Sequence, residues 1–122
     1  MILSENFAEN FVKEWLEGWN SHDLDKILSH YSEDFTIETS VALKLIPESG
    51  GKIKGKENVR NYWSKALKLN TNLKFEVKDI LLGINAITIY YLNVTTNKNV
   101  VEILFFNDKM EVKKVVVHRS YK

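Results

Sequence analysis

The chain has no cysteine among its 122 residues. This absence excludes disulfides, thiolate nucleophiles and cysteine metal sites, and it agrees with a reducing compartment. No apolar run approaches the roughly 20 residues that a helix needs to cross a bilayer. The N-terminal segment MILSENFAEN lacks the basic start and the long apolar core of a signal peptide. We therefore expect a cytoplasmic protein.

The chain also lacks an excess of charge of either sign. It has 17 basic and 16 acidic residues, which gives a formal net charge of +1, and the two signs alternate along most of the sequence. A balanced surface of this kind excludes neither catalysis nor ligand binding. It does argue against nucleic acid or an anionic membrane as a partner. The length fits one domain, which we expect to cover residues 1–122.

Motifs for cofactors and metals are missing as well. The sequence contains no glycine-rich phosphate loop, no nucleophile elbow and no context for a serine triad. Its three histidines show no metal-ligand spacing. Any reaction would therefore be cofactor-free, and no metal site is expected. His22 and His30 lie in polar helical surroundings and are interpreted as surface residues.

The first half of the chain has helical periodicity. An apolar stripe from Phe7 to Trp19 predicts a first helix with Ser4 as its N-cap. Ser21 or Asp23 would cap a second helix, whose stripe is Leu24, Ile27, Leu28 and Tyr31. Residues 35–39 then alternate like a strand, residues 40–55 look irregular, and a third helix opens at Gly55.

The last third of the chain predicts strands over residues 73–82, 86–94, 100–106 and 112–121, because these segments alternate or are rich in β-branched residues. Short turns separate them. Helices followed by an antiparallel meander are typical of an α+β domain and not of a doubly wound α/β fold.

The strand at residues 100–106 is apolar on both faces. Val100, Glu102, Leu104 and Phe106 point to one side, and Val101, Ile103 and Phe105 point to the other. A sheet in a small α+β domain usually has one face in water. The simplest cover for the second face is another copy of the chain, in a homodimer that packs sheet against sheet. A loop or terminal segment over that face is the alternative.

Three segments resemble the nuclear transport factor 2-like superfamily, and within it the SnoaL-like branch: WNSHDLDKILSHYSEDF, GKIKGKENVRNYWSKAL and EILFFNDKMEVKKVVVHRSY. The resemblance implies a cone-shaped fold, cystatin-like in outline, in which a curved antiparallel sheet wraps around N-terminal helices and leaves a hydrophobic pocket at its open end. It also implies dimers formed through the sheet. Members of the superfamily include isomerases, cyclases, dehydratases, hydrolases, ligand binders and transport adaptors.

Ketosteroid isomerases in this superfamily use a carboxylate base, a tyrosine and a protonated aspartic acid. On this chain the resemblance places these roles on Thr39, Trp15 and Glu102. Thr39 cannot accept a proton at neutral pH, and an indole N–H has no titratable phenol. Two of the three roles are missing, so steroid isomerisation by this mechanism is rejected. SnoaL-type cyclases are described with an acid/base pair, and Glu102 with His118 could be its counterpart here, although the motifs do not match both positions.

Glu102 and His118 are therefore the candidate catalytic residues. A carboxylate in the apolar run VVEILFF is costly unless it is paired or neutral, and burial would raise its pKa. Adjacent antiparallel strands could bring His118 close enough to share a proton with it. The alternatives are a salt bridge or hydrogen bond that closes the core, and a satisfied core histidine.

Five residues are candidates for ligand binding: Trp15, Trp19, Tyr31, Glu38 and Trp63. The aromatic rings could wall a pocket for a flat hydrophobic molecule, although ordinary helix–sheet packing would explain each ring by itself. Glu38 could be a pocket carboxylate or an exposed strand residue. Of the adjacent Tyr90 and Tyr91, only one can face inward.

The sequence thus predicts a SnoaL-like protein with a pocket for a small apolar molecule. It leaves three functions open. The first is a cofactor-free acid/base isomerase, cyclase or hydrolase, the second a non-catalytic ligand-binding protein, and the third a dimeric adaptor whose cone is filled by its own side chains.

Overall fold

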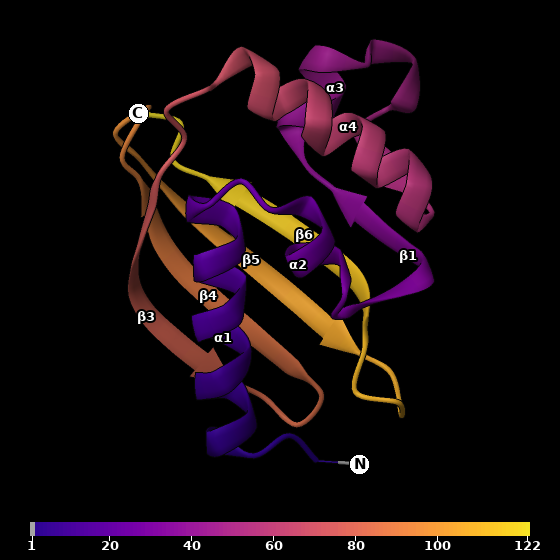
Figure 1. Cartoon of the computed structure of the whole chain (residues 1–122), viewed down its shortest axis with the longest axis vertical. Helices are drawn as coiled ribbons and strands as arrows, with labels where there is room; N and C mark the ends of the chain where they lie inside the picture. Colours follow the sequence, from indigo (N-terminus) through magenta and orange to yellow (C-terminus); the bar gives the residue numbers. More distant parts are fainter. Residues whose placement is uncertain (1) are drawn as a thin grey trace.

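The computed structural model describes residues 2–122 as one curved six-stranded sheet with helices on one side, which confirms the α+β class (Figure 1). The helices are α1 (Glu5–Asn20), α2 (Leu24–Leu28), α3 (Ser40–Leu45), the 3-10 turn η1 (Pro47–Ser49) and α4 (Lys56–Leu69). The strands are β1 (Tyr31–Glu38), β2 (Lys52–Lys54), β3 (Phe75–Leu82), β4 (Ala86–Asn93), β5 (Lys98–Phe106) and β6 (Val112–Arg119). None of the described helices is long and apolar enough to cross a membrane.

The sheet has the strand order β2-β1-β6-β5-β4-β3. The predicted meander of β3 to β6 is antiparallel throughout, whereas β1 joins β6 in parallel and pairs Ile37 with Val115. Figure 1 shows α1 and α2 in front of the sheet, with α4 and α3 toward one end of it. The side chains between the helices and the inner face of the sheet form the buried core, and we call this region the cone interior.

Helix α1 begins where Ser4 accepts a hydrogen bond from the backbone N–H of Phe7, at 3.0 Å, as the sequence predicts. At its other end the side-chain amide of Asn20 exchanges two hydrogen bonds with the backbone of Phe75, at 3.0 and 2.8 Å. The side chain of Asn20 thus makes the pair of backbone hydrogen bonds that a neighbouring strand would make with β3. This contact fixes the end of α1, and with it Trp15 and Trp19, against the sheet.

Gly18 lets α1 and α2 approach each other. A Cβ atom at this position would lie 2.8 Å from Cγ1 of Ile27, whose side chain is fully buried. Alanine normally stabilises a helix interior by about 1 kcal/mol relative to glycine, but overpacking costs about 1–3 kcal/mol. We expect Gly18→Ala to lower the free energy of unfolding by about 1 kcal/mol in urea denaturation. Asn10→Ala, at an exposed position of the same helix, should be neutral or stabilising. A more stable Gly18→Ala protein would contradict the close approach.

Two predicted segments are wrong. Tyr31 does not continue the second helix, because α2 ends at Leu28 and Tyr31 begins β1 opposite Val112. Residues 40–55 are not irregular, because the Thr39 hydroxyl caps α3 and β2 pairs with β1. Of the two predicted caps for α2, Asp23 is the one used, and its side chain accepts from the N–H of Lys26.

The two faces of β5 differ as the sequence predicts. The inner face is buried, with exposed fractions from 0% to 8%; its residues are Val100, Glu102, Leu104 and Phe106. The outer face is half-buried; its residues are Val101, Ile103 and Phe105. The described chain thus leaves an apolar strip partly open to solvent on the side of the sheet away from the helices.

Candidate functional site

Glu102 is the one carboxylate among the buried side chains of residues 2–122, with 6% of its surface exposed. It lies on the inner face of β5, between Ile89 of β4 and Val117 of β6. Strand alternation places it there, because its neighbours Val100 and Leu104 belong to the core. The sheet therefore carries a single ionisable acid into an apolar interior.

Tyr91 is the hydrogen-bond partner of this acid. Its hydroxyl donates to Oε2 of Glu102 over 2.6 Å. Burial raises the pKa of Glu102 from 4.5 to about 7, and the hydrogen bond from Tyr91 offsets part of that rise. Near neutral pH both forms of Glu102 are populated. A carboxyl group in this state can give or take a proton without a large cost.

The charge of Glu102 also affects the pKa values of two more tyrosines. Burial raises the pKa of Tyr31, Tyr62 and Tyr91, and the negative charge of Glu102 raises each of them further. Of the three phenol groups, the one of Tyr91 contacts the carboxyl group directly, and all three stay protonated at neutral pH.

Two polar atoms beside this cluster have no hydrogen-bond partner. They are the indole N–H of Trp15 and the hydroxyl of Tyr31, both fully shielded from solvent. The Trp15 indole is near enough to lower the pKa of Tyr31, although the two groups do not meet hydrogen-bond geometry. A buried donor without a partner costs about 1–3 kcal/mol. An acceptor oxygen within reach of either atom would satisfy it.

The aromatic residues that the sequence nominates do come together. Trp15 stacks on Phe75 with ring centres 5.7 Å apart, and Tyr31 meets Trp63 edge-on at 5.7 Å. Trp19 contacts Trp63 at 4.9 Å. All of these rings are 1–6% exposed, so they form part of the core in the cone interior.

The predicted pairing of Glu102 with His118 is wrong. In the register of β5 and β6, Glu102 lies opposite Val117, and His118 lies opposite Val101 on the outer face. His118 is exposed to solvent. Neighbouring residues of a strand point to opposite sides of a sheet, so the two side chains are separated by the sheet and cannot exchange a proton directly.

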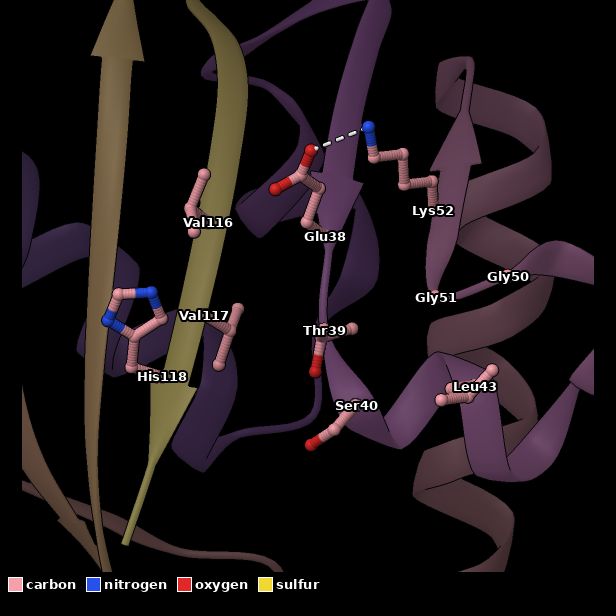
Figure 2. A pocket seen from close by; sticks show the side chains of 10 residues that line it. All are labelled: Glu38, Thr39, Ser40, Leu43, Gly50, Gly51, Lys52, Val116, Val117 and His118. Carbon is pink, nitrogen blue, oxygen red and sulfur yellow. Dashed lines mark ion pairs between the residues drawn. The ribbon is translucent and has the colours of Figure 1, made fainter.

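Glu38 also lies on the outer side. Its carboxylate pairs with Nζ of Lys52 at 3.0 Å, and this hydrogen bond holds the pKa of Glu38 below its usual value. Together with His118, it lines a cleft of about 300 Å³ between β6 and the end of β1, which Figure 2 shows. Glu38 is therefore separated from the four aromatic candidates.

Sequence reasoning missed Tyr62 and left open the choice between Tyr90 and Tyr91. Alternation predicts that Tyr90 and Tyr91 face opposite ways, and the pairing of Tyr91 with Val100 settles that Tyr91 faces inward. Tyr62 follows Val59 on the buried side of α4, where a helical stripe indicates no more than core packing. Only the three-dimensional structure shows that Tyr91 bonds to the carboxyl group of Glu102 and that the charge of Glu102 raises the pKa of Tyr62.

A metal site does not emerge from this geometry. Within residues 2–122, no three histidine, aspartate or glutamate side chains are grouped so that they could hold an ion. The cluster of Glu102, Tyr91, Tyr31 and Trp15 offers one acid and several hydrogen-bond donors. It is suited to bind a ligand oxygen and to move a proton.

Residues 12–117 match the family model of the SnoaL-like domain. Among solved structures, a SnoaL-like protein of unknown function from Burkholderia thailandensis is 32% identical, with a TM-score of 0.93 over 98% of this chain and 99% of the other. None of the curated proteins matches the chain significantly in sequence.

More distant structures share the fold. A candidate polyketide cyclase from Sinorhizobium meliloti is 10% identical, with a TM-score of 0.70 over 89% of this chain and 94% of the other. A candidate ketosteroid isomerase from Kribbella flavida is 12% identical, with a TM-score of 0.63 over 94% of this chain and 78% of the other. At these identities the likeness concerns the fold alone.

Proposed function

Because the chain belongs to the SnoaL-like domain family, we propose that it binds a small, largely apolar molecule in the cone interior and exchanges a proton with it through Glu102. One observation carries the proposal. An acid with a pKa of about 7 lies beside two buried donors that have no partner, Trp15 Nε1 and Tyr31 Oη. A protein that needed only a closed core would gain stability from apolar side chains at these positions.

Each residue has a role in this proposal. Trp15 and Tyr31 donate hydrogen bonds to an oxygen of the ligand, and these bonds strengthen as negative charge develops on that oxygen. Glu102 gives or takes the proton at a neighbouring atom. Tyr91 is a positioning residue, because it holds the carboxyl group and touches no ligand. Proton transfer next to a carbonyl group underlies isomerase and cyclase chemistry and needs no cofactor. The names of the distant structural neighbours agree with that class.

Deuterium exchange tests this proposal directly. The flat apolar ketone 1-tetralone exchanges its α-protons slowly with D₂O, and NMR measures the rate. We expect the protein to accelerate the exchange and Glu102→Gln to reduce that acceleration by about 100-fold or more, since a positioned general base contributes about 10²–10⁴-fold. An acceleration that Glu102→Gln leaves intact would remove Glu102 from the chemistry. Binding without any acceleration would favour the second candidate function, a non-catalytic ligand-binding protein.

Tyr31→Phe separates binding from packing. The Tyr31 hydroxyl has no partner in the core, so its removal should leave the stability of the unliganded protein unchanged or raise it by up to about 1 kcal/mol. The same change should weaken binding of 2-naphthol about five- to tenfold, measured by tryptophan fluorescence. Tyr90→Phe, on the outer face, is the matched control and should leave the affinity unchanged. A Tyr31→Phe protein that is much less stable would show that the hydroxyl serves the core.

The partner that we propose for the outer face is a second copy of the chain. Val101, Ile103 and Phe105 form its apolar centre. Lys54 and Lys114 lie toward the β2 edge, whereas the β3 edge carries Glu76 and Asp79. A two-fold axis along the strands would place the basic side of one copy over the acidic side of the other. The expected location of this dimer is the cytoplasm.

A further inference from the structure

A second cleft lies on the helical side of the sheet, between α4 and the turn that joins α1 to α2. It has a volume of about 480 Å³ and is lined by residues 21–25 and by Arg60. We call it the helix cleft. Figure 1 shows these helices on one side of the sheet, whereas the apolar strip of β5 lies on the other side. A dimer formed through that strip therefore leaves the helix cleft accessible.

A single ion pair crosses the helix cleft. Nη2 of Arg60 on α4 lies 2.7 Å from Oδ1 of Asp25 on α2. Among the described residues, it is the one polar contact between α4 and the α1–α2 segment of residues 5–28. The two side chains are 41% and 85% exposed. Water and salt weaken an ion pair this exposed, so this contact holds the two elements together only weakly.

On the buried side, two tryptophans join the same two elements. Trp63 lies one turn after Arg60 on α4, and Trp19 lies two residues before the helix cleft begins, near the end of α1. Their ring centres are 4.9 Å apart, in an edge-on contact. We call the contact region between α4 and the α1–α2 turn the helix seam. It is closed by an exposed ion pair on the outside and by two rings on the inside.

A continuous row of contacts leads from the helix seam to the buried acid. Trp19 contacts Phe75 with ring centres 5.5 Å apart, and Phe75 contacts Tyr91 at 4.5 Å. Tyr91 donates the hydrogen bond to Glu102. All of the rings in this row are 4–6% exposed, and an interior packed in this way has no room for a ligand until its walls move. Opening the helix seam at Trp19 exposes the row from its outer end.

The two ends of α4 allow such a movement. Gly55 precedes the helix with a φ of 95°, a backbone conformation that favours glycine, and no side chain caps the helix there. At the other end, residues 70–72 form a turn before Leu73, whose carbonyl oxygen accepts a hydrogen bond from Nε2 of His22 over 2.9 Å. Asn20 also holds the end of α1 on β3 by two hydrogen bonds. The α1–α2 turn is therefore fixed to the start of β3, and α4 is the element that is free to hinge.

From these observations we propose that the helix seam is the gate of the cone interior. The Arg60–Asp25 ion pair is its latch, and α4 moves outward to separate Trp63 from Trp19 and to admit a ligand to the row that ends at Glu102. The inference rests on the proposed function and adds how entry to that site is controlled. It also accounts for donors without partners in a tightly packed core, because the closed form is then the unliganded one.

Hydrogen exchange at the indole nitrogen of Trp19 tests the gate without a ligand. This N–H is shielded from solvent and has no hydrogen-bond partner, so its exchange with D₂O requires exposure to water and no broken hydrogen bond. NMR measures the rate. We expect Asp25→Asn to accelerate the exchange about two- to fivefold, because an exposed ion pair favours the closed form by no more than about fivefold. Salt at about 1 M should accelerate the exchange of the native protein to a similar degree.

Three further variants assign the effect to the ion pair. Arg60→Gln should give the same acceleration as Asp25→Asn, and the double variant should add nothing further, because both changes remove one interaction. Glu17→Gln is the matched control. It breaks the exposed pair of Glu17 with Lys26, at 3.0 Å, which joins α1 to α2 and does not involve α4. This variant should exchange at the native rate.

A reversible bridge across the helix seam tests its role in ligand entry. Because the chain has no cysteine, Asp25→Cys with Arg60→Cys supplies the only two thiols, and the cleavable cross-linker dithiobismaleimidoethane joins them. We expect the bridge to slow both the exchange at Trp19 and the association of 2-naphthol by about tenfold or more, because it depletes the open form. Reduction of the linker should restore both rates. Protein whose two thiols carry N-ethylmaleimide is the control and should not be slowed.

The outcomes separate this inference from the proposed function. The gate is overturned if Trp19 exchanges no faster, relative to its intrinsic rate, than the backbone amide of Leu104 in the buried centre of β5, because only global unfolding then exposes the indole. It is also overturned if the latch variants exchange at the native rate, or if the bridged protein binds 2-naphthol as fast as the reduced one. No binding of 2-naphthol and no exchange of 1-tetralone would instead overturn the proposed function, while the exchange rates of Trp19 still show whether the helix seam opens.

Discussion

Glu102→Gln should stabilise the folded protein by about 3 kcal/mol at pH 8 and change its stability little at pH 4. The pKa of Glu102 is raised from 4.5 to about 7 in the folded state, mainly by burial. Each pKa unit corresponds to about 1.4 kcal/mol. Glutamine keeps an oxygen that can accept the hydrogen bond from Tyr91 and has no charge to bury. The variant therefore does not carry the free-energy cost of burying an ionised carboxylate.

The direction of this pH dependence of stability follows from the number of protons that the folded and unfolded states bind. Between pH 4.5 and 7 the unfolded chain has lost the proton of Glu102, whereas the folded chain still holds it. The unfolded state then binds fewer protons, so the contribution of this group to stability falls as pH rises. The loss is complete above about pH 7, and below about pH 4.5 the group makes no difference between native protein and variant.

Urea denaturation of both proteins at intervals from pH 4 to pH 8 measures this difference. Asp108→Asn, in the exposed turn between β5 and β6, is a control that should follow the native profile. A native protein whose stability relative to Glu102→Gln stays constant across this range would mean that Glu102 is not buried as a proton-binding group. Glu102 would then not be poised for proton transfer either.

The sequence is sufficient to predict which way most strand residues face. Alternation alone places Glu102 inward with Val100 and Leu104, and it places Glu38 on the side opposite its neighbour Thr39. Each of these predictions depends only on the period of a single strand. The buried acid, the most informative residue of the site, can therefore be identified from the sequence alone.

Which residues of two neighbouring strands lie side by side is harder to predict, because it depends on the register of the strands. The alternation of β6 leaves open whether His118 or Val117 lies beside Glu102. That choice is made by the turn after β5 and by an irregularity in pairing between Phe105 and Phe106. A shift of one residue moves every side chain to the other face, so the predicted Glu102–His118 pair depends on an alignment that the sequence does not contain.

Tyr31 illustrates a second limit. Together with Leu24, Ile27 and Leu28 it completes a helical stripe, and local periodicity favours a helix through this position. The structure places it in β1 because β6, about 80 residues later in the chain, offers a parallel partner at Val112. The hydroxyl of Tyr31 reaches the neighbourhood of Glu102 only through that distant pairing.

Ile103→Asp should dissociate the proposed dimer. Ile103 lies at the centre of the outer face, flanked by Thr88 on β4 and Val116 on β6. In an interface with two-fold symmetry, the substitution would bury two carboxylates without partners, one from each copy. Burying an unpaired charge costs several kcal/mol, so we expect the dissociation constant to rise by at least 100-fold.

Sedimentation equilibrium over a range of micromolar concentrations distinguishes the two states. The native protein should behave as a dimer and Ile103→Asp as a monomer, with a circular dichroism spectrum that shows the variant to be folded. Ile84→Asp is the control, because Ile84 is 70% exposed in the turn between β3 and β4, away from the apolar centre. A monomeric native protein would refute the dimer, and a dimeric Ile103→Asp protein would move the interface to another surface. The loss of the dimer should leave the exchange of 1-tetralone unchanged, because Glu102, Tyr31 and Trp15 all belong to one copy of the chain.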